Sequence, residues 1–272
     1  MNRKELTSNI ISKQSFLCVG LDSDINKIPK HLISYPDPVF EFNRQIIDAT
    51  KDLCVSYKIN TAFYESRGTK GWESMERTLH YIPKDIFTIA DAKRGDIGNT
   101  ATHYARTFFE TLPFDAVTLS PYMGEDSIRP FLEFDNKWAI LLGLTSNPGA
   151  KDFQFIQTTS GHKVYQEVIA KCASWGSPDN IMFVTGATRS ELLQDLRTII
   201  PNHFLLVPGI GAQGGSLDQT FEAAANDDIG LIINSSRDII FADSTENFAE
   251  AAKTKAQLVQ NQMRTLMSHI KV

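Results

Sequence analysis

Short runs of apolar residues recur along the chain, and polar segments with helical periodicity separate them. Most of these runs are nearly continuously apolar rather than alternating, as expected for strands that are covered on both faces. We predict eight strands, at 15–22, 54–60, 86–93, 116–122, 138–146, 181–187, 203–211 and 229–236. We predict amphipathic helices at 37–52, 98–112, 161–176, 187–201 and 216–227, and a last long helix over about 245–270.

This alternation predicts an α/β protein with a (β/α)8, or TIM, barrel. No low-complexity linker or fixed-period repeat divides the chain, so we expect a single domain over 1–272 with N- and C-terminal helices. If two of the strands were absent, a doubly wound open sheet would be the alternative. Both architectures place functional residues at the C-terminal ends of strands. Residues 64–77, YESRGTKGWESMER, are predicted to be a polar segment that either covers the site or is simply solvated.

Composition and charge limit the kinds of ligand, cellular location and metal site that we expect for this chain. A formal net charge of −5 argues against a broad nucleic-acid surface but permits a small anionic ligand. Residues 1–14 lack an apolar signal core and no apolar run approaches ~18 residues, so we expect neither secretion nor a membrane span. Cys18, Cys54 and Cys172 lack a Cys-x-x-Cys spacing, which favours buried thiols in a reducing cytosol. The histidines lack metal-ligand spacing, so no metal site is predicted.

The stretch FTIADAKRGDIGNT, residues 87–100, combines an apolar strand pattern with a dense group of charges. Asp91, Lys93 and Asp96 follow the apolar run directly. Asp91 and Lys93 are two residues apart on a strand, so their side chains are predicted to share a face. The alternative is a solvated turn, with Asp96 as the N-cap of the helix that follows, because Asp is a favoured cap.

Lys58 and Asn60, at the end of the preceding strand, share a face for the same reason. If these two strands are neighbours, as consecutive barrel strands are, Lys58, Asp91 and Lys93 converge on one pocket. Carboxylates beside an ammonium group favour its charged form. The pattern therefore predicts that Lys93 acts as a cationic acid rather than as a free-amine nucleophile.

The ends of the last two predicted strands indicate a phosphate site. Residues 208–215, PGIGAQGG, match a dinucleotide fingerprint only formally, because they come late and the next strand ends in Asn-Ser-Ser-Arg. Glycine-rich loops let backbone N–H groups approach an anion closely, and barrels often bind phosphate after strands seven and eight. Gln213 and Arg237 lie at these two places. The alternatives are a plain turn and, for Arg237, a surface salt bridge.

In chain order, Lys58, the motif Asp91-x-Lys93-x-x-Asp96-Ile97, TSNPG at 145–149, PGIGAQGG and Ser236-Arg237 resemble the orotidine 5′-phosphate decarboxylase family over nearly the whole chain. The length and the YKINTAFYES segment look like the family's longer bacterial branch, type 2. Related phosphosugar decarboxylases and synthases share the Asp-x-Lys-x-x-Asp motif. Those relatives use a metal and generally carry an acidic residue where this chain has Lys58.

The resemblance implies cofactor-free conversion of orotidine 5′-phosphate to uridine 5′-phosphate in pyrimidine biosynthesis. It implies that Lys93 donates the proton, that Asp91 holds Lys93 beside the departing carboxylate, and that Lys58 links Asp91 to the ribose. It implies a cytoplasmic homodimer in which Asp96, Ile97 and Thr100 reach into the partner's site. It also implies substrate contacts from Asp22 to the ribose, from Ser146 to the pyrimidine, from Gln213, Ser236 and Arg237 to the phosphate, and from Asn60 and Pro208.

Three other functions remain open from the sequence. One is a metal-dependent phosphosugar decarboxylase or aldolase on the same barrel. The second is a Schiff-base aldolase using Lys58 or Lys93, although flanking carboxylates oppose the neutral amine that it needs. The third is a non-catalytic nucleotide-phosphate binding protein, which would need the phosphate loops but not the Asp-Lys-Asp group.

Overall fold

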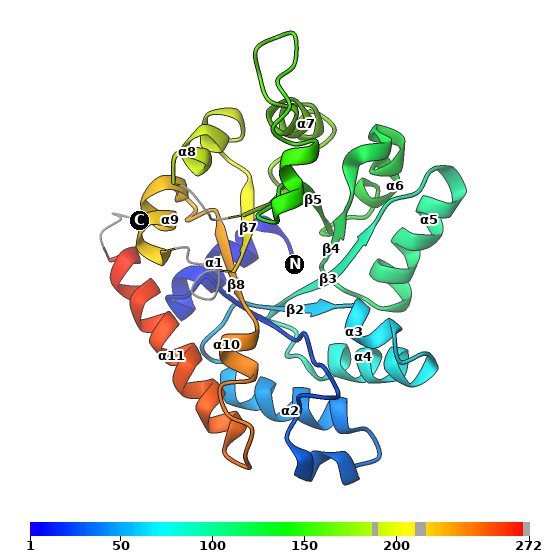
Figure 1. Cartoon of the computed structure of the whole chain (residues 1–272), viewed down its shortest axis with the longest axis vertical. Helices are drawn as coiled ribbons and strands as arrows, with labels where there is room; N and C mark the ends of the chain where they lie inside the picture. Colours follow the sequence, from blue (N-terminus) through cyan, green and yellow to red (C-terminus); the bar gives the residue numbers. More distant parts are fainter. Residues whose placement is uncertain (187–189, 210–215, 269–272) are drawn as a thin grey trace.

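The computed structural model describes residues 1–186, 190–209 and 216–268 of the 272-residue chain. Eight parallel strands close into a barrel in chain order (Figure 1). They are β1 (Leu17–Gly20), β2 (Ser56–Asn60), β3 (Phe87–Arg94), β4 (Ala116–Leu119), β5 (Trp138–Leu144), β6 (Ile181–Thr185), β7 (Phe204–Pro208) and β8 (Leu231–Ser235). Every predicted strand overlaps an observed one, so the predicted (β/α)8 barrel is confirmed and the open sheet is wrong.

Helices surround this barrel and cover its N-terminal end (Figure 1). They are α1 (Arg3–Lys13), α2 (Pro38–Thr50), α3 (Ala62–Glu65), α4 (Thr69–Tyr81), α5 (Gly98–Arg106), α6 (Arg129–Leu132), α7 (Val164–Ala173), α8 (Ser190–Ile199), α9 (Leu217–Ala224), α10 (Arg237–Ile240) and α11 (Phe248–Met267). Within the described ranges, none of these helices combines the length and apolar character that a membrane span requires.

The segment 64–77, expected to be a polar cover or a solvated run, instead belongs mainly to the crossover helix α4. Its inner face includes Ser74, Met75 and Thr78, all of them buried. Thr78 accepts a hydrogen bond from Asn43 of α2, whose Nδ2 lies 2.9 Å from the threonine Oγ1. The prediction failed because most residues of this helix are polar, although its few apolar residues lie on one face.

The helix α1 closes the N-terminal end of the barrel, and Figure 1 shows the N-terminus over the centre of the ring. The amino group of Met1 lies 2.7 Å from Asp115 Oδ1, just before β4. The indole Nε1 of Trp138 donates to the Met1 carbonyl oxygen at 2.9 Å, and Arg3 pairs with Asp228 at 2.7 Å. These contacts anchor the N-terminal segment across this end of the barrel.

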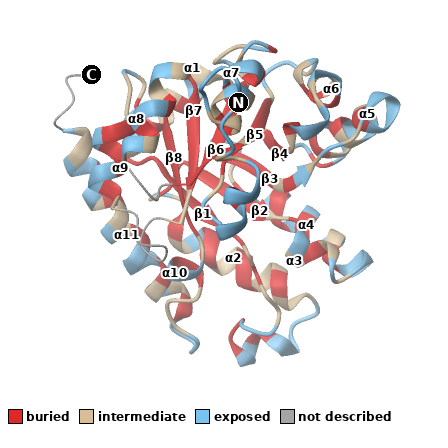
Figure 2. Cartoon of the chain, turned by 45° about the horizontal axis from the view of Figure 1, so that its top comes forward, coloured by how far each residue is buried: buried red, intermediate tan, exposed pale blue. Residues whose placement is uncertain are grey.

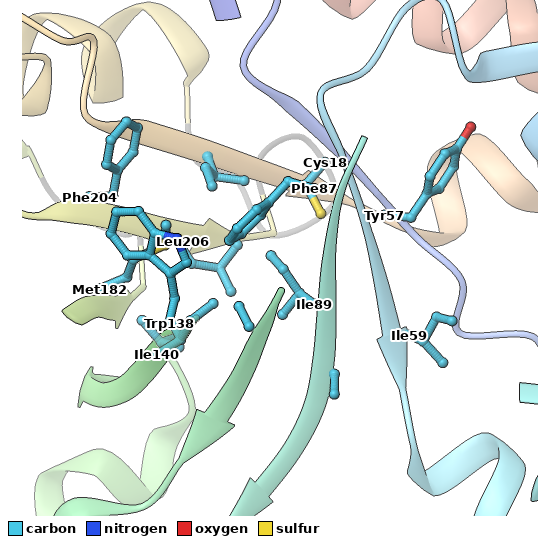
Figure 3. Packing of buried hydrophobic residues seen from close by; sticks show 14 of the residues in the cluster. Cys18, Tyr57, Ile59, Phe87, Ile89, Trp138, Ile140, Met182, Phe204 and Leu206 are labelled. Carbon is cyan, nitrogen blue, oxygen red and sulfur yellow. The ribbon is translucent and has the colours of Figure 1, made fainter. Parts of the chain in front are cut away.

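Large apolar side chains fill the barrel interior. Figure 2 shows that the strands are the most buried part of the protein. Phe87, Trp138 and Phe204, from β3, β5 and β7, form one layer whose successive ring centroids are 6.2 Å apart (Figure 3). Alternate strands supplying a layer is typical of this fold. On β2, Tyr57 points outward and its hydroxyl donates to the Ile47 carbonyl of α2 at 3.2 Å. Side chains alternate along a strand, so the neighbouring Lys58 points into the barrel.

The three cysteines are confirmed as buried, free thiols. Burial raises the pKa of Cys18, Cys54 and Cys172 to about 12 in each case. The thiolate is the reactive form of cysteine, so all three are inert packing residues at neutral pH.

Candidate active site

A pocket opens at the C-terminal end of the barrel, at the strand ends where the sequence predicted functional residues. Charged side chains on one wall come from β2, β3 and the segment after β1, and the opposite wall comes from β7, β8 and α10. The lining residues are Asp22, Lys58, Asn60, Asp91, Lys93, Val184, Leu206, Pro208, Gly209, Asn234, Ser235, Ser236, Arg237 and Asp238. The pocket therefore joins the predicted charged group to part of the predicted phosphate site.

Asp91 lies at the centre of the charged group. Its Oδ2 is 2.9 Å from the Nζ of Lys58, and its Oδ1 is 2.5 Å from the Nζ of Lys93. The Lys58 ammonium also lies 3.4 Å from Asp22 Oδ1. The convergence of Lys58, Asp91 and Lys93 that the sequence predicted is thus present, and one carboxylate bridges two ammonium groups.

Electrostatic interactions keep both Asp91 and Lys58 ionised at neutral pH. Burial opposes ionisation of Asp91, but the ammonium groups of Lys58 and Lys93 outweigh it and lower the pKa of Asp91 to about 2. Burial also opposes the charge on Lys58, yet Asp91 and Asp22 outweigh it and raise the pKa of Lys58 above its usual value. At neutral pH the pocket therefore presents a permanent carboxylate beside a buried permanent cation.

Lys93 reaches Asp91 through an irregularity in β3. Ala90 pairs with Val117 and Arg94 pairs with Leu119, so three residues of β3 lie opposite the single Thr118 of β4. Within this bulge, Lys93 has a left-handed backbone with φ of +47°, which is uncommon for a residue other than glycine. Bulges are frequent beside active sites because they redirect a side chain. Here the bulge leaves Lys93 half exposed at the pocket while it still contacts Asp91.

The opposite wall carries the guanidinium of Arg237. Arg237 begins α10 and is exposed, and no carboxylate of the described residues lies within ion-pair distance of it. The surface salt bridge considered from the sequence is therefore absent from the described part of the chain. Gln213 and most of PGIGAQGG, residues 210–215, lie outside the described residues.

Ser236, the residue before Arg237, packs against Gly20 where β1 closely approaches the end of β8. A Cβ atom on Gly20 would lie 1.9 Å from the Ser236 Oγ, so any larger residue at position 20 would displace the serine. The Ser236 Oγ accepts a hydrogen bond from Asn234 Nδ2 at 3.2 Å. These contacts set the Ser236 hydroxyl at the pocket edge.

Asp96, Ile97 and Thr100 lie at the same end of the barrel but do not line this pocket. The Asp96 Oδ1 accepts a hydrogen bond from the backbone N–H of Ile97 at 2.8 Å. The helix α5 begins at Gly98 with Ile97 as its N-cap, and it has no side-chain cap. The alternative that Asp96 caps this helix is therefore wrong.

Ser146 and Asn60 occupy two other strand ends. Ser146 follows β5 and is packed against Gly186, where a Cβ atom would lie 2.8 Å from the serine Cβ. It does not belong to the pocket lining. Asn60 does line the pocket, and its Oδ1 also accepts from the backbone N–H of Ala62 at 3.2 Å, at the start of α3.

A comparison with protein families identifies the class of this site. The model described as "Orotidine 5'-phosphate decarboxylase / HUMPS family" matches residues 15–252. The chain belongs to this family. The resemblance that the motifs indicated is confirmed.

Curated relatives and solved structures agree with this family. The chain is 56% identical over 270 residues to "Orotidine 5'-phosphate decarboxylase" from Phocaeicola vulgatus, covering 98% of this chain and 99% of the relative. It is 56% identical over 266 residues to the protein of the same name from Bacteroides fragilis, covering 97% of each. The structure of Leishmania donovani OMP decarboxylase matches with a TM-score of 0.82 and 32% identity, covering 97% of this chain and 99% of that one.

Two polar residues of this orotidine 5′-phosphate decarboxylase family member escaped the sequence analysis. Thr118 is 1% exposed, and its hydroxyl donates to Asp91 Oδ1 at 3.0 Å. Asn234 lines the pocket, and its buried Oδ1 has no hydrogen-bond partner among the described residues. Both could have been noticed in the sequence, because each is a polar residue in a mostly apolar strand, at a position that alternation turns inward.

The side chains of the pocket can also be examined as possible ligands of a metal ion. Among the described residues, no group of three or more His, Cys, Asp or Glu side chains is arranged to hold a metal ion. The carboxylates of Asp22 and Asp91 instead both contact the Lys58 ammonium, at 3.4 and 2.9 Å. The cation between these carboxylates is therefore a side chain of the protein itself.

Proposed function

We propose that this protein converts orotidine 5′-phosphate to uridine 5′-phosphate in pyrimidine biosynthesis, without a metal or cofactor. The observation that carries the proposal is one pocket in which Lys58, Asp91 and Lys93 form a charged network. The guanidinium of Arg237, which has no carboxylate partner within the described part of the chain, lines the same pocket. Family membership and relatives of that name at 56% identity support the substrate.

Lys93 is proposed as the proton donor. Breaking the bond to the carboxylate leaves the electron pair on a ring carbon, in an orbital that cannot delocalise into the π system. An ammonium group beside that carbon stabilises the developing charge and then transfers a proton to it as carbon dioxide leaves. The Nζ of Lys93 is held 2.5 Å from Asp91 in a half-exposed position at the pocket, from which it can reach a bound substrate.

Asp91 and Lys58 are proposed to prepare this step. The Asp91 carboxylate would lie close to the substrate carboxylate, an unfavourable contact that ends when carbon dioxide departs. It also fixes Lys93 before the reaction, so little reorganisation is needed as charge develops. Lys58 would link Asp91 to the ribose hydroxyls, and Asp22, 3.4 Å from Lys58, would bind the ribose.

The remaining contacts are proposed to bind parts of the substrate distant from the reacting carbon. Arg237, Ser236 and Gln213 would hold the phosphate, and Ser146 would contact the pyrimidine, with further contacts from Asn60 and Pro208. Binding energy from a distant phosphate can secure the reacting geometry and drive closure that excludes water. Excluding water strengthens every charge interaction in the pocket.

We also propose that the chain is one domain, 1–272, and acts as a cytoplasmic homodimer in which Asp96, Ile97 and Thr100 complete the partner's site. Asp96 does not line the pocket of its own chain. At the same end of the barrel, Ile97 is 48% exposed, and Tyr122 and Met123 after β4 are 95% and 48% exposed. Such an exposed apolar surface is typical of an interface. The buried free thiols fit a reducing compartment.

The activity is tested by following the ultraviolet absorbance of orotidine 5′-phosphate with purified protein that has been dialysed against a chelator. We expect turnover at the same rate before and after chelation, because the proposed step uses only side chains. A metal-dependent phosphosugar enzyme would lose its activity instead, and a Schiff-base aldolase would be trapped by borohydride in the presence of its substrate. Absence of turnover, or turnover that requires added metal, would contradict the proposal.

Sharing of the site is tested by mixing two inactive variants, Lys93→Ala and Asp96→Ala, under conditions that exchange subunits. If Asp96 serves the partner, each mixed dimer has one intact site, and the mixture recovers up to about a quarter of wild-type activity. The control mixture pairs Lys93→Ala with Lys58→Ala, whose lesions lie in the site of their own chain. Recovery in neither mixture would place Asp96 in its own chain's site.

A further inference from the structure

Thr118 of β4 contacts both of the residues that carry the proposed chemistry on β3. Its hydroxyl donates to Asp91 Oδ1 at 3.0 Å and accepts from the backbone N–H of Lys93 at 2.9 Å. The residue is 1% exposed, so water cannot replace either bond. Since a hydroxyl has one proton to donate, accepting from the amide leaves that proton for the carboxylate.

The position of Thr118 opposite the bulge explains these contacts. Three residues of β3, from Asp91 to Lys93, lie between the ladder pairs Ala90–Val117 and Arg94–Leu119. An extra residue in a strand is left without its ladder partner. The Thr118 hydroxyl supplies the missing acceptor for the Lys93 amide, whose left-handed φ of +47° requires support from its surroundings.

We propose that Thr118 is a positioning residue, which fixes the backbone of Lys93 and the Oδ1 of Asp91 so that the ammonium of Lys93 is held in its reacting position. This inference rests on the proposed function, in which Lys93 delivers the proton. Lys58 holds only the Oδ2 of Asp91, at 2.9 Å. Without Thr118, the half-exposed ammonium of Lys93 would be the remaining partner of the other oxygen among the described residues.

The expected cost follows from the precision that a proton transfer requires. A misplacement of about 1 Å in a reacting group can lower a rate about 100-fold. Substrate affinity depends on other groups, among them Arg237 and Asp22 on the pocket walls. Loss of the Thr118 hydroxyl is therefore expected to lower kcat and to leave KM almost unchanged.

Thr88 is a matched control on the same pair of strands. Its hydroxyl donates to Asp115 Oδ2 at 2.9 Å and accepts from the Asp115 backbone N–H at 3.0 Å. It is 6% exposed. Thr88 thus repeats the chemistry of Thr118 at the closed N-terminal end of the barrel, away from the pocket.

The experiment compares Thr118→Val, Thr118→Ala and Thr118→Ser with Thr88→Val, using orotidine 5′-phosphate. Both hydroxyl-free variants at position 118 should lower kcat by about 10- to 100-fold and keep KM within about twofold of wild type. The reason is that they misplace the Lys93 ammonium but keep the groups that bind the substrate. Thr118→Ser should keep most of kcat. Thr88→Val should lower the melting temperature while leaving kcat unchanged.

Hydrogen exchange followed by mass spectrometry gives a readout that needs no activity. The amide of Lys93 should exchange faster in Thr118→Val and Thr118→Ala than in wild type and Thr118→Ser. Unchanged kcat in both hydroxyl-free variants, or a loss in Thr88→Val equal to theirs, would overturn the positioning role. A wild-type protein without turnover would instead contradict the proposed function, and the exchange rates would still decide whether Thr118 holds the bulge.

Discussion

Replacing Lys93 with alanine is expected to lower turnover of orotidine 5′-phosphate by at least about 10⁴-fold, because both the stabilising cation and the proton donor are lost. The fold should remain intact. The side chain of Lys93 is half exposed, and Asp91 would keep its contacts with Lys58 at 2.9 Å and with Thr118 at 3.0 Å. The removed group thus supports the reaction far more than it supports the barrel.

The measurement is kcat of the variant, with circular dichroism and thermal melting to verify the fold. Lys51→Ala is the matched control, because Lys51 follows α2, is 40% exposed, and also pairs with a carboxylate, Asp48, at 3.6 Å. Its kcat should equal that of wild type. Substantial activity in Lys93→Ala would remove Lys93 from the role of proton donor.

The barrel could be predicted from the sequence because the burial of its strands determines the pattern of apolar residues along the chain. Strands covered on both faces produce continuous apolar runs, and these stand out between helical segments. Once the strands were located, the closed barrel brought Lys58 of β2 and Asp91 of β3 to one end without further information. The helix α4 was missed because most of its residues are polar, and its few buried apolar residues, such as Met75 and Leu79, are confined to one face.

The candidate site was predicted in its components but not in its local geometry. Simple alternation along a strand placed Asp91 and Lys93 on one face, and their side chains do meet. The structure achieves this differently, with a bulge that gives Lys93 a left-handed backbone. Such a bulge depends on the register between two strands, which local sequence does not specify. Thr118 was missed for the same reason, since its role exists only opposite the bulge.

Arg237→Ala is expected to lower kcat/KM for orotidine 5′-phosphate by about 100-fold, because a charge-assisted contact to the phosphate is lost. For the nucleoside orotidine, which has no phosphate, the change should be small. Arg237 is suited to this role because, within the described part of the chain, no carboxylate neutralises its guanidinium. In the proposed site, the nearby Ser236 hydroxyl would offer the phosphate a neutral donor.

Comparing the two substrates separates phosphate recognition from a general disturbance of the pocket. Arg237→Lys retains the charge but loses the two-pronged geometry of the guanidinium, so its loss should be intermediate. Arg264→Ala is the control for removing an exposed arginine, because Arg264 lies on α11 and its guanidinium donates to the Asn261 side chain, away from the pocket. It should leave both substrates unaffected. Equal losses for nucleotide and nucleoside in Arg237→Ala would mean that the phosphate binds elsewhere in the protein.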